Sequence, residues 1–253
     1  MASSSTVRGG AAPNWFLGVS QGGIPGTSFV AKFGRNPSIG SGETEDVWGA
    51  GGTWVAPTQA RTHSITGDAA DVNTSGTGAW TVSVQGLNAS YAVTTETVNM
   101  AGAGGVNTSN SYVIIYRMIV LTAGTGGTNA GVIAATAATD STVTCSILAG
   151  VGQSQMAIYQ IPAGYTAYMM GFNGSMNGGN NANVLLNLFA KPFGGVFNLK
   201  SSISLNAAGS SFGTRLFPVP LTFAAKTTIK LRATSDAVGS DVTGEFDLIL
   251  VAD

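Results

Sequence analysis

Few side chains in this sequence could do chemistry, and its single histidine and single cysteine come first. His63 lies in the run RTHSIT, at the start of an expected strand, where a histidine usually faces a surface or an interface. A catalytic triad would hold it between a nucleophile and an orienting carboxylate, and we expect no strand-to-helix nucleophile elbow around any serine. Cys145 alternates with Val143 and Ile147, which indicates a buried thiol without the neighbours that activate cysteine. The sequence therefore predicts no catalytic residue.

Carboxylates are sparse, with 12 aspartate and glutamate residues among 253. Glu96 and Glu245 are the only glutamates expected within strands, and a glycosidase needs two carboxylates that face each other across a cleft. The sequence does not bring these two together. A polysaccharide depolymerase built on them is thus the third-ranked hypothesis, behind two non-enzymatic functions.

Metal and cofactor sites lack their usual patterns. Asp68 with Asp71, and Asp236 with Asp241, each bracket a short loop that could hold a weakly bound ion, but no EF-hand pattern is present. One cysteine and one histidine cannot make a structural zinc site. The glycine runs match neither a dinucleotide fingerprint nor a P-loop. We expect no metal and no cofactor.

The composition narrows the class of protein further. Only 9% of the 253 residues are charged, the net charge is −1, and 44% are apolar. Nucleic-acid binding needs a clustered basic face, and a membrane helix needs about 20 consecutive apolar residues; neither occurs. A surface with so little charge indicates that hydroxyl and amide side chains keep it hydrated, or that neighbouring subunits cover it.

From residue 61 onward, short strands with a period of two alternate with glycine-rich turns, which predicts an all-β protein. We expect ten to twelve strands and no helix, in an antiparallel jelly-roll-like β-sandwich over residues 61–253. A tight turn at Pro162, Ala163 and Gly164 joins two of these strands. After it, Tyr168, Met170 and Phe172 share one face, which we expect to be core.

Residues 1–60 differ from the rest because they are rich in proline and glycine and lack a sustained period. They nevertheless carry three of the four tryptophans, and a flexible linker would be poor in aromatic residues. We expect an extended N-terminal arm that either anchors in pockets on a neighbour or wraps over its own sandwich. Arm anchors for a partner would then be the aromatic residues Trp15, Phe16, Phe29, Phe33, Trp48 and Trp54.

The run LTAGTGGTNAGVIAATAATDSTVTCSILAGVGQSQMAIYQIPAGYTAYM and the ending IKLRATSDAVGSDVTGEFDLILV resemble virion structural proteins of tailed bacteriophages, particularly marine ones. The resemblance covers roughly residues 40–253. It implies a jelly-roll module that forms a homotrimer and binds the major capsid protein or other virion proteins. Its location would be the virion, assembled in the host cytoplasm.

Two functions follow from this resemblance. The first is a head decoration or cement protein that stabilises the capsid through contacts. The alternative is a tail or knob module that binds a host receptor or glycan. Neither function requires nucleic-acid or membrane binding.

Overall fold

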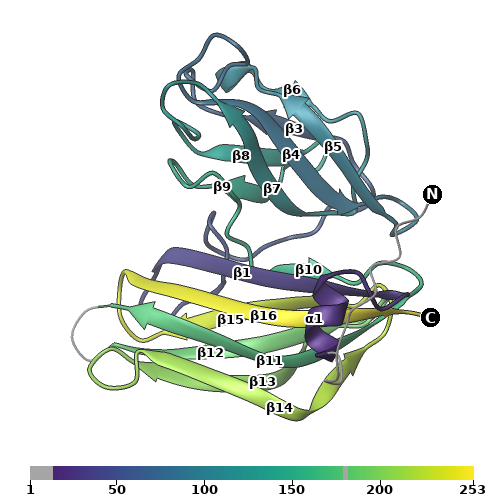
Figure 1. The fold of residues 1–253 in the computed structure, drawn as a ribbon. Coiled ribbons are helices and arrows are strands. Elements are labelled where there is room, and N and C mark those ends of the chain that lie inside the picture. Colours follow the sequence, from purple (N-terminus) through teal and green to yellow (C-terminus); the bar gives the residue numbers. More distant parts are fainter. Residues whose placement is uncertain (1–13, 179–181) are drawn as a thin grey trace.

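The computed structural model describes residues 14–178 and 182–253, and nearly all of its regular structure is β (Figure 1). Its helical elements are the six-residue α1 (Trp15–Ser20) and a single 3₁₀ turn, η1 (Gly102–Gly104). In the described part of the chain, no helix is long and apolar enough to cross a membrane. The predicted all-β class and antiparallel sheets are confirmed.

Two sheets form a sandwich that is the lower body in Figure 1. One sheet has the order β1-β16-β11-β14, and the other has the order β10-β15-β12-β13 with β2 paired to β15. The strands are β1 (Thr27–Ile39), β2 (Thr44–Asp46), β10 (Ile158–Gln160), β11 (Tyr165–Asn177), β12 (Asn183–Lys191), β13 (Asn198–Asn206), β14 (Phe212–Phe223), β15 (Thr228–Ser235) and β16 (Ser240–Ala252). Apart from the β12–β13 hairpin, successive strands from β10 onward cross between the sheets, which is consistent with the predicted jelly roll.

The strands between β2 and β10 form a second body, the upper lobe in Figure 1. It has a four-stranded sheet of order β6-β3-β8-β9 and a three-stranded sheet of order β5-β4-β7. These strands are β3 (His63–Thr66), β4 (Ala79–Leu87), β5 (Val93–Asn99), β6 (Val106–Asn107), β7 (Ile114–Ala123), β8 (Ile133–Ala137) and β9 (Val143–Ile147). The upper lobe is therefore an insertion into the lower sandwich.

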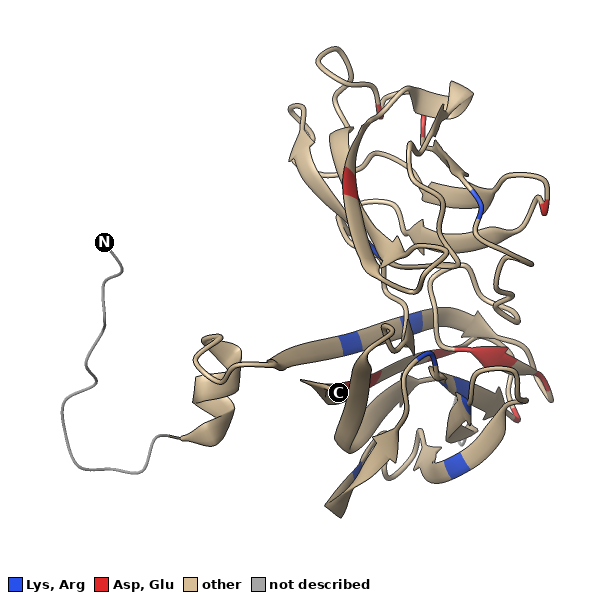
Figure 2. Ribbon diagram, turned by 90° about the vertical axis from the view of Figure 1, so that its right-hand side faces the viewer, with Lys and Arg blue, Asp and Glu red and all other residues tan. Residues whose placement is uncertain are grey.

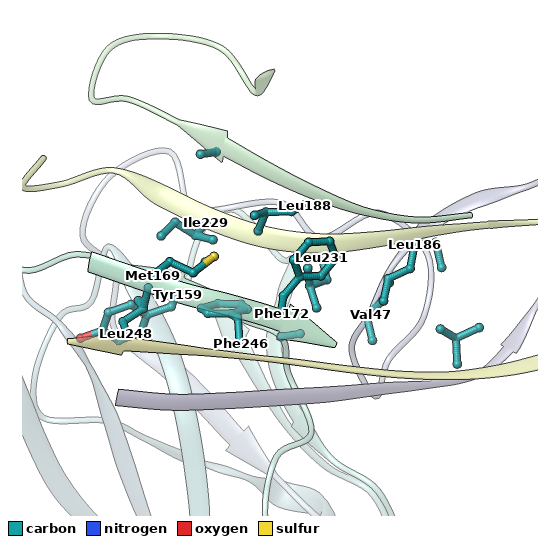
Figure 3. Close-up of a cluster of buried hydrophobic side chains, with 14 of the residues drawn as sticks. Val47, Tyr159, Met169, Phe172, Leu186, Leu188, Ile229, Leu231, Phe246 and Leu248 are labelled. Carbon is teal, nitrogen blue, oxygen red and sulfur yellow. The ribbon is translucent and has the colours of Figure 1, made fainter. Parts of the chain in front are cut away.

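Each body has its own hydrophobic core. In the lower sandwich the inward faces of the two sheets interdigitate, with Phe172 and Phe246 from one sheet against Leu186 and Leu231 from the other (Figure 3). Such alternation of buried and outward residues is what a sandwich requires of its strands. The strands of this chain are thus divided between two hydrophobic cores and do not share one.

The β11 core face differs from the predicted one. Met169 and Phe172 are buried, whereas Tyr168 and Met170 are partly exposed on the outer face of the sheet. The cause is a β-bulge between Met169 and Gly171, which shifts the register against both neighbouring strands. A one-residue shift moves side chains to the opposite face, so a strict period of two assigned Tyr168 and Met170 to the wrong face.

Residues 27–47, which the sequence analysis placed in an extended arm, lie within the lower sandwich. Strand β1 pairs with β16 along nearly its whole length, and Ile39 and Val47 belong to the lower core. The alternation of β1 is hidden in the sequence because two of its inward positions carry the polar residues Lys32 and Asn36, both buried. The expected extended arm is therefore wrong for these residues, because they form strands of the sandwich and do not wrap over it.

Polar contacts join the two bodies where β1 passes under β7. The Lys32 Nζ donates to the carbonyl oxygen of Tyr116, and the Arg117 guanidinium donates to the carbonyl oxygen of Ala31. The backbone N–H of Met156 donates to the carbonyl oxygen of Phe33 at 2.8 Å. Arg117 thus has the partner that its place in an apolar strand requires.

Candidate attachment surface

The structure places His63 in the upper lobe, fully buried, without the neighbours that catalysis needs. Its Nδ1 lies 3.0 Å from the carbonyl oxygen of Arg61, and its ring packs edge-on against Tyr112. Burial lowers the pKa of His63 to about 4, so the imidazole is neutral near pH 7. The expected surface or interface position for this histidine is wrong, because its side chain is packed inside the upper lobe.

The G-x-S-x-G pattern occurs twice, at residues 18–22 and 209–213. The first match runs through the end of α1, where the Ser20 hydroxyl donates to the carbonyl oxygen of Leu17. The second lies in the β13–β14 connection. A nucleophile elbow joins a strand to a following helix, so neither match has that context.

Cys145 is buried in the upper core, as its alternation with apolar residues predicted. Burial raises the pKa of its thiol to about 11, so the reactive thiolate is scarce at neutral pH.

The carboxylates singled out in the sequence bind protein groups. Glu96 on β5 accepts hydrogen bonds from the backbone N–H groups of Ser109 and Asn110 and from the Tyr112 hydroxyl. Glu245 lies on β16 in the other body and accepts from the side chain of Asn173. The two glutamates therefore do not form a pair.

The two aspartate pairs are occupied in the same way. Asp71 is buried and accepts from four backbone N–H groups, while Asp241 forms an ion pair with Arg35 at 2.6 Å. Asp236 accepts from the backbone and side chain of Asn183. Within residues 14–178 and 182–253, no cluster of three histidine, cysteine or acidic side chains could hold a metal ion.

Two of the six predicted arm anchors are not available to a partner. Trp48 and Trp54 are only 4% and 5% exposed, and both belong to the upper core. The indole N–H of Trp54 donates to the carbonyl oxygen of Thr144 at 2.9 Å. These tryptophans lie where the chain leaves the lower sandwich, so they anchor the insertion to its own core.

The remaining anchors are exposed, and three of them gather with other apolar residues on the outer face of the β1-β16-β11-β14 sheet. Trp15 and Phe16 are 46% and 58% exposed, and Phe29 on β1 is 49% exposed and lies opposite Ile249 of β16. We call this surface the aromatic face. Its members are Trp15, Phe16, Phe29, Tyr168, Met170, Pro220, Ile249 and Val251.

Helix α1 stands off the sheet and leaves a cleft between them. Asn14 caps the helix by accepting from the backbone N–H of Phe16 at 3.1 Å, which satisfies one of the first free amides. The rings of Trp15 and Phe16 pack edge to face, with centroids 5.4 Å apart. Figure 2 shows α1 projecting beyond the body of the sandwich. The cleft beneath it has a volume of about 360 Å³ and an almost wholly apolar lining.

The aromatic face carries no charge, and its polar neighbour lies farther along the same sheet. Phe33, 37% exposed, lies opposite Glu245, in a shallow hollow with Asn173, Ser175 and Thr243. Burial and the nearby Glu245 together raise the pKa of Asp247. Phe33 is therefore an anchor candidate surrounded by polar and charged residues, whereas Trp15, Phe16 and Phe29 lie in an apolar surface.

Four residues that line the cleft, the partly exposed Tyr168, Met170 and Val251 and the buried Ile249, were not predicted to belong to a surface site. Ile249 and Val251 alternate with the inward residues Leu248 and Leu250, so β16 is apolar on both faces near its end. A strand apolar on both faces is covered on both faces. That signal was present in the sequence and indicated an outer cover for this end of the sheet.

No protein-family model and no curated protein sequence matches this chain. Among solved structures it is similar to one described as the structure of infectious bursal disease virus Gx strain, with 9% identity and a TM-score of 0.25, over 89% of this chain and 71% of that one. It is also similar to the infectious bursal disease virus VP2 subviral particle, with 9% identity and a TM-score of 0.23, over 89% and 72% of the respective chains. These TM-scores are too low to define a shared fold.

Proposed function

We propose that this chain is a structural component of a phage virion, a head decoration or cement protein that binds the capsid as a homotrimer and stabilises it. The observation that carries the proposal is the aromatic face. Monomeric proteins rarely expose large contiguous apolar patches, and such patches mark interaction surfaces. The resemblance of residues 40–253 to virion structural proteins supplies the class of partner.

The aromatic face has the composition of an interface centre. Tryptophan and other large aromatic residues dominate binding energy when a partner desolvates them, and truncating such a residue typically costs about 2 kcal/mol or more. Trp15 and Phe16 project from α1 over an open cleft. An apolar side chain of a capsid subunit that entered the cleft would contact α1 on one side and the sheet on the other.

Attachment to particles tests this function. Replacing Trp15 and Phe16 together by serine should leave the fold intact, because both side chains are exposed, and should weaken binding to capsids that lack this protein at least tenfold. The matched control replaces Val132, an exposed apolar residue of the upper lobe, by serine. Co-sedimentation of purified chain with such capsids measures both variants.

Cryo-electron microscopy of the virion supplies the location. Density for this chain on the capsid shell, with the aromatic face toward the shell, is the expected result. Density on the tail alone would contradict a head decoration role and favour the alternative, a tail or knob module that binds a host receptor or glycan. A pocket between the two bodies favours that alternative.

A further inference from the structure

A second pocket lies where the upper lobe meets the lower sandwich, apart from the aromatic face. We call it the junction pocket. It has a volume of about 180 Å³, and none of its lining residues is acidic. Its walls come from the 54–59 linker, the turn before β5, and the loops at the ends of β12 and β14. The polar, charged and aromatic residues of its lining include Gln59, Tyr91, Gln160, Lys191, Phe193 and Lys226.

Lys226 is held in the pocket by two aromatic rings. Its Nζ lies 4.9 Å from the ring centroid of Tyr91 and 4.9 Å from that of Phe193, and the two rings meet edge to face at 5.5 Å. Cation–π contacts of this kind hold an ammonium without neutralising its charge. Among the described residues no carboxylate forms an ion pair with Lys226.

The backbone at this place is strained on both sides of the pocket. Tyr91 and Lys226 are non-glycine residues with φ of +60° and +64°, a conformation that is uncommon and costs about 1 kcal/mol or more. Hydrogen bonds hold both residues in place: the Ala163 N–H donates to the Tyr91 carbonyl oxygen, and Gln160 Nε2 donates to that of Lys226. Such strain is concentrated at ligand-binding and active sites.

A second lysine strengthens the positive potential. Lys191 lines the pocket, and its Nζ lies 5.4 Å from the ring centroid of Phe197, whose ring also lies 4.3 Å from the Nζ of Lys230. Lys230 is paired with the buried Asp46, which Arg232 shares. A single carboxylate thus serves Lys230 and Arg232, and Lys191 adds an ammonium that has no ion pair in the described structure.

The carboxylates bonded to the pocket wall are already paired: Asp46, which accepts from the Trp54 N–H, forms ion pairs with Lys230 and Arg232. Asp140 accepts from the N–H and hydroxyl of Thr58, which lines the pocket, and forms an ion pair with Arg61 at 3.2 Å. Among the described residues, the charges that line the pocket without an ion pair are the ammonium groups of Lys191 and Lys226. An anion is the complementary ligand.

The other lining groups indicate what carries the anion. Gln59 and Gln160 offer amide donors and acceptors, Thr228 offers a hydroxyl, and the rings of Tyr91 and Phe193 offer apolar surface. No arginine lines the pocket, although arginine is over-represented where phosphate is bound bidentately. Drug-sized ligands fill about 300–1,000 Å³, so this volume suits one ring.

We propose that the junction pocket binds a carboxylated sugar unit of an acidic glycan. The carboxylate lies between the Nζ atoms of Lys191 and Lys226, the amides of Gln59 and Gln160 bind ring hydroxyls, and the sugar ring packs against Phe193. This inference does not rest on the proposed virion attachment, because the junction pocket and the aromatic face share no residue.

Titration of the full chain with trigalacturonate tests the proposal, with neutral galactotriose and sodium sulfate as comparison probes. Calorimetry should show saturable binding of trigalacturonate alone. Amide shifts in an NMR titration should centre on Gln160, Lys191 and Lys226. Equal binding of galactotriose would overturn the role of the lysines, and equal competition by sulfate would reduce the pocket to a site for simple anions.

Variants locate the binding. Lys191→Met and Lys226→Met should each weaken trigalacturonate binding at least tenfold. The control Lys200→Met changes an exposed lysine that does not line the pocket and should bind as the unaltered chain does. Thermal unfolding checks the fold of each variant, and Lys191→Met decides alone if Lys226→Met does not fold. Unchanged binding in a folded Lys191→Met chain, or absence of trigalacturonate binding to the unaltered chain, would overturn the proposal. Attachment to capsids should be unaffected by any of these changes.

Discussion

Two of the buried charged residues, Asp46 and Lys32, lie at the places where the two bodies connect. Asp46 is fully buried at the end of β2, where the chain leaves the lower sandwich, and it pairs with Lys230 at 2.8 Å and Arg232 at 3.1 Å. Its Oδ2 also accepts from the backbone N–H of Trp54. A buried ion pair is weak evidence for stability, and this one ties the start of the insertion to β15.

Lys32 is the most strongly perturbed of these charges. Burial, and after it the nearby charge of Arg117, lower the pKa of Lys32 to about 7. The unfolded chain keeps the ordinary pKa of 10.5, so between these values unfolding takes up a proton. Stability must then rise with pH across that window and lose this contribution as pH falls toward 7.

We expect the free energy of unfolding to rise between pH 7 and 9.5, with a Lys32 contribution of up to ~1.4 kcal/mol per pH unit. Lys32→Met removes the titrating group and should flatten this slope, whereas Lys200→Met, at an exposed lysine, should retain it. Urea unfolding at several pH values measures both. Parallel slopes for the unaltered chain and Lys32→Met would show that Lys32 is charged in the folded protein.

At the scale of elements, β1 separates the part of the N-terminal segment that is structural from the part that is free for attachment. β1 is an edge strand paired with β16, and with β2 it leads into the buried Asp46 pair. Helix α1 contributes Val19 as its only buried residue. The structure therefore divides residues 1–60 near residue 25, and not at residue 60.

Two truncations distinguish these parts. Removing residues 1–24 should leave a cooperatively folded chain that no longer attaches to capsids, because it deletes Trp15 and Phe16 while keeping β1. Removing residues 1–56 should abolish cooperative unfolding, since it deletes β1 and the core residues Ile39 and Val47. Circular dichroism during heating and capsid co-sedimentation check both. A folded chain after the longer deletion would mean that β1 is dispensable.

At the scale of the molecule, one side of the lower sandwich is suited to contact with other copies. β13 and β14 are the edges of their sheets, and β14 exposes Leu216 and Val219 at 71% and 81%. Pro218 and Pro220 in β14 cannot donate to a strand ladder, which discourages open-ended strand pairing. Association here would occur through side chains, and in the proposed homotrimer it would close on itself.

Light scattering should give the unaltered chain a mass of three times 25.5 kDa. Replacing Leu216 and Val219 together by serine should shift it to a single-chain mass, because these side chains would supply the apolar contact. The control is Val238→Ser, at a residue 79% exposed in the β15–β16 turn. A monomeric unaltered chain at micromolar concentration would contradict the homotrimer.

The sequence by itself determined the fold class and the burial of the single cysteine. Alternation with a period of two and glycine-rich turns indicated antiparallel strands, and Cys145 between Val143 and Ile147 was correctly predicted to be buried. Strands and turns are local features, encoded in neighbouring residues. The alternation around Cys145 is itself broken, because a register shift between β8 and β9 leaves Val143 38% exposed and buries Thr144 and Ser146.

Only the tertiary structure decided which faces and which segments belong together. The bulge at Met169 places Tyr168 and Met170 on the outer face. The buried polar residues Lys32 and Asn36 interrupt the apolar pattern of β1, so the sequence did not indicate this strand. Trp48 and Trp54 are buried in the core of the inserted upper lobe. Each of these depends on a partner distant in the chain, such as β16 for β1. The aromatic face and the junction pocket both join segments more than a hundred residues apart, so no local pattern could have located them.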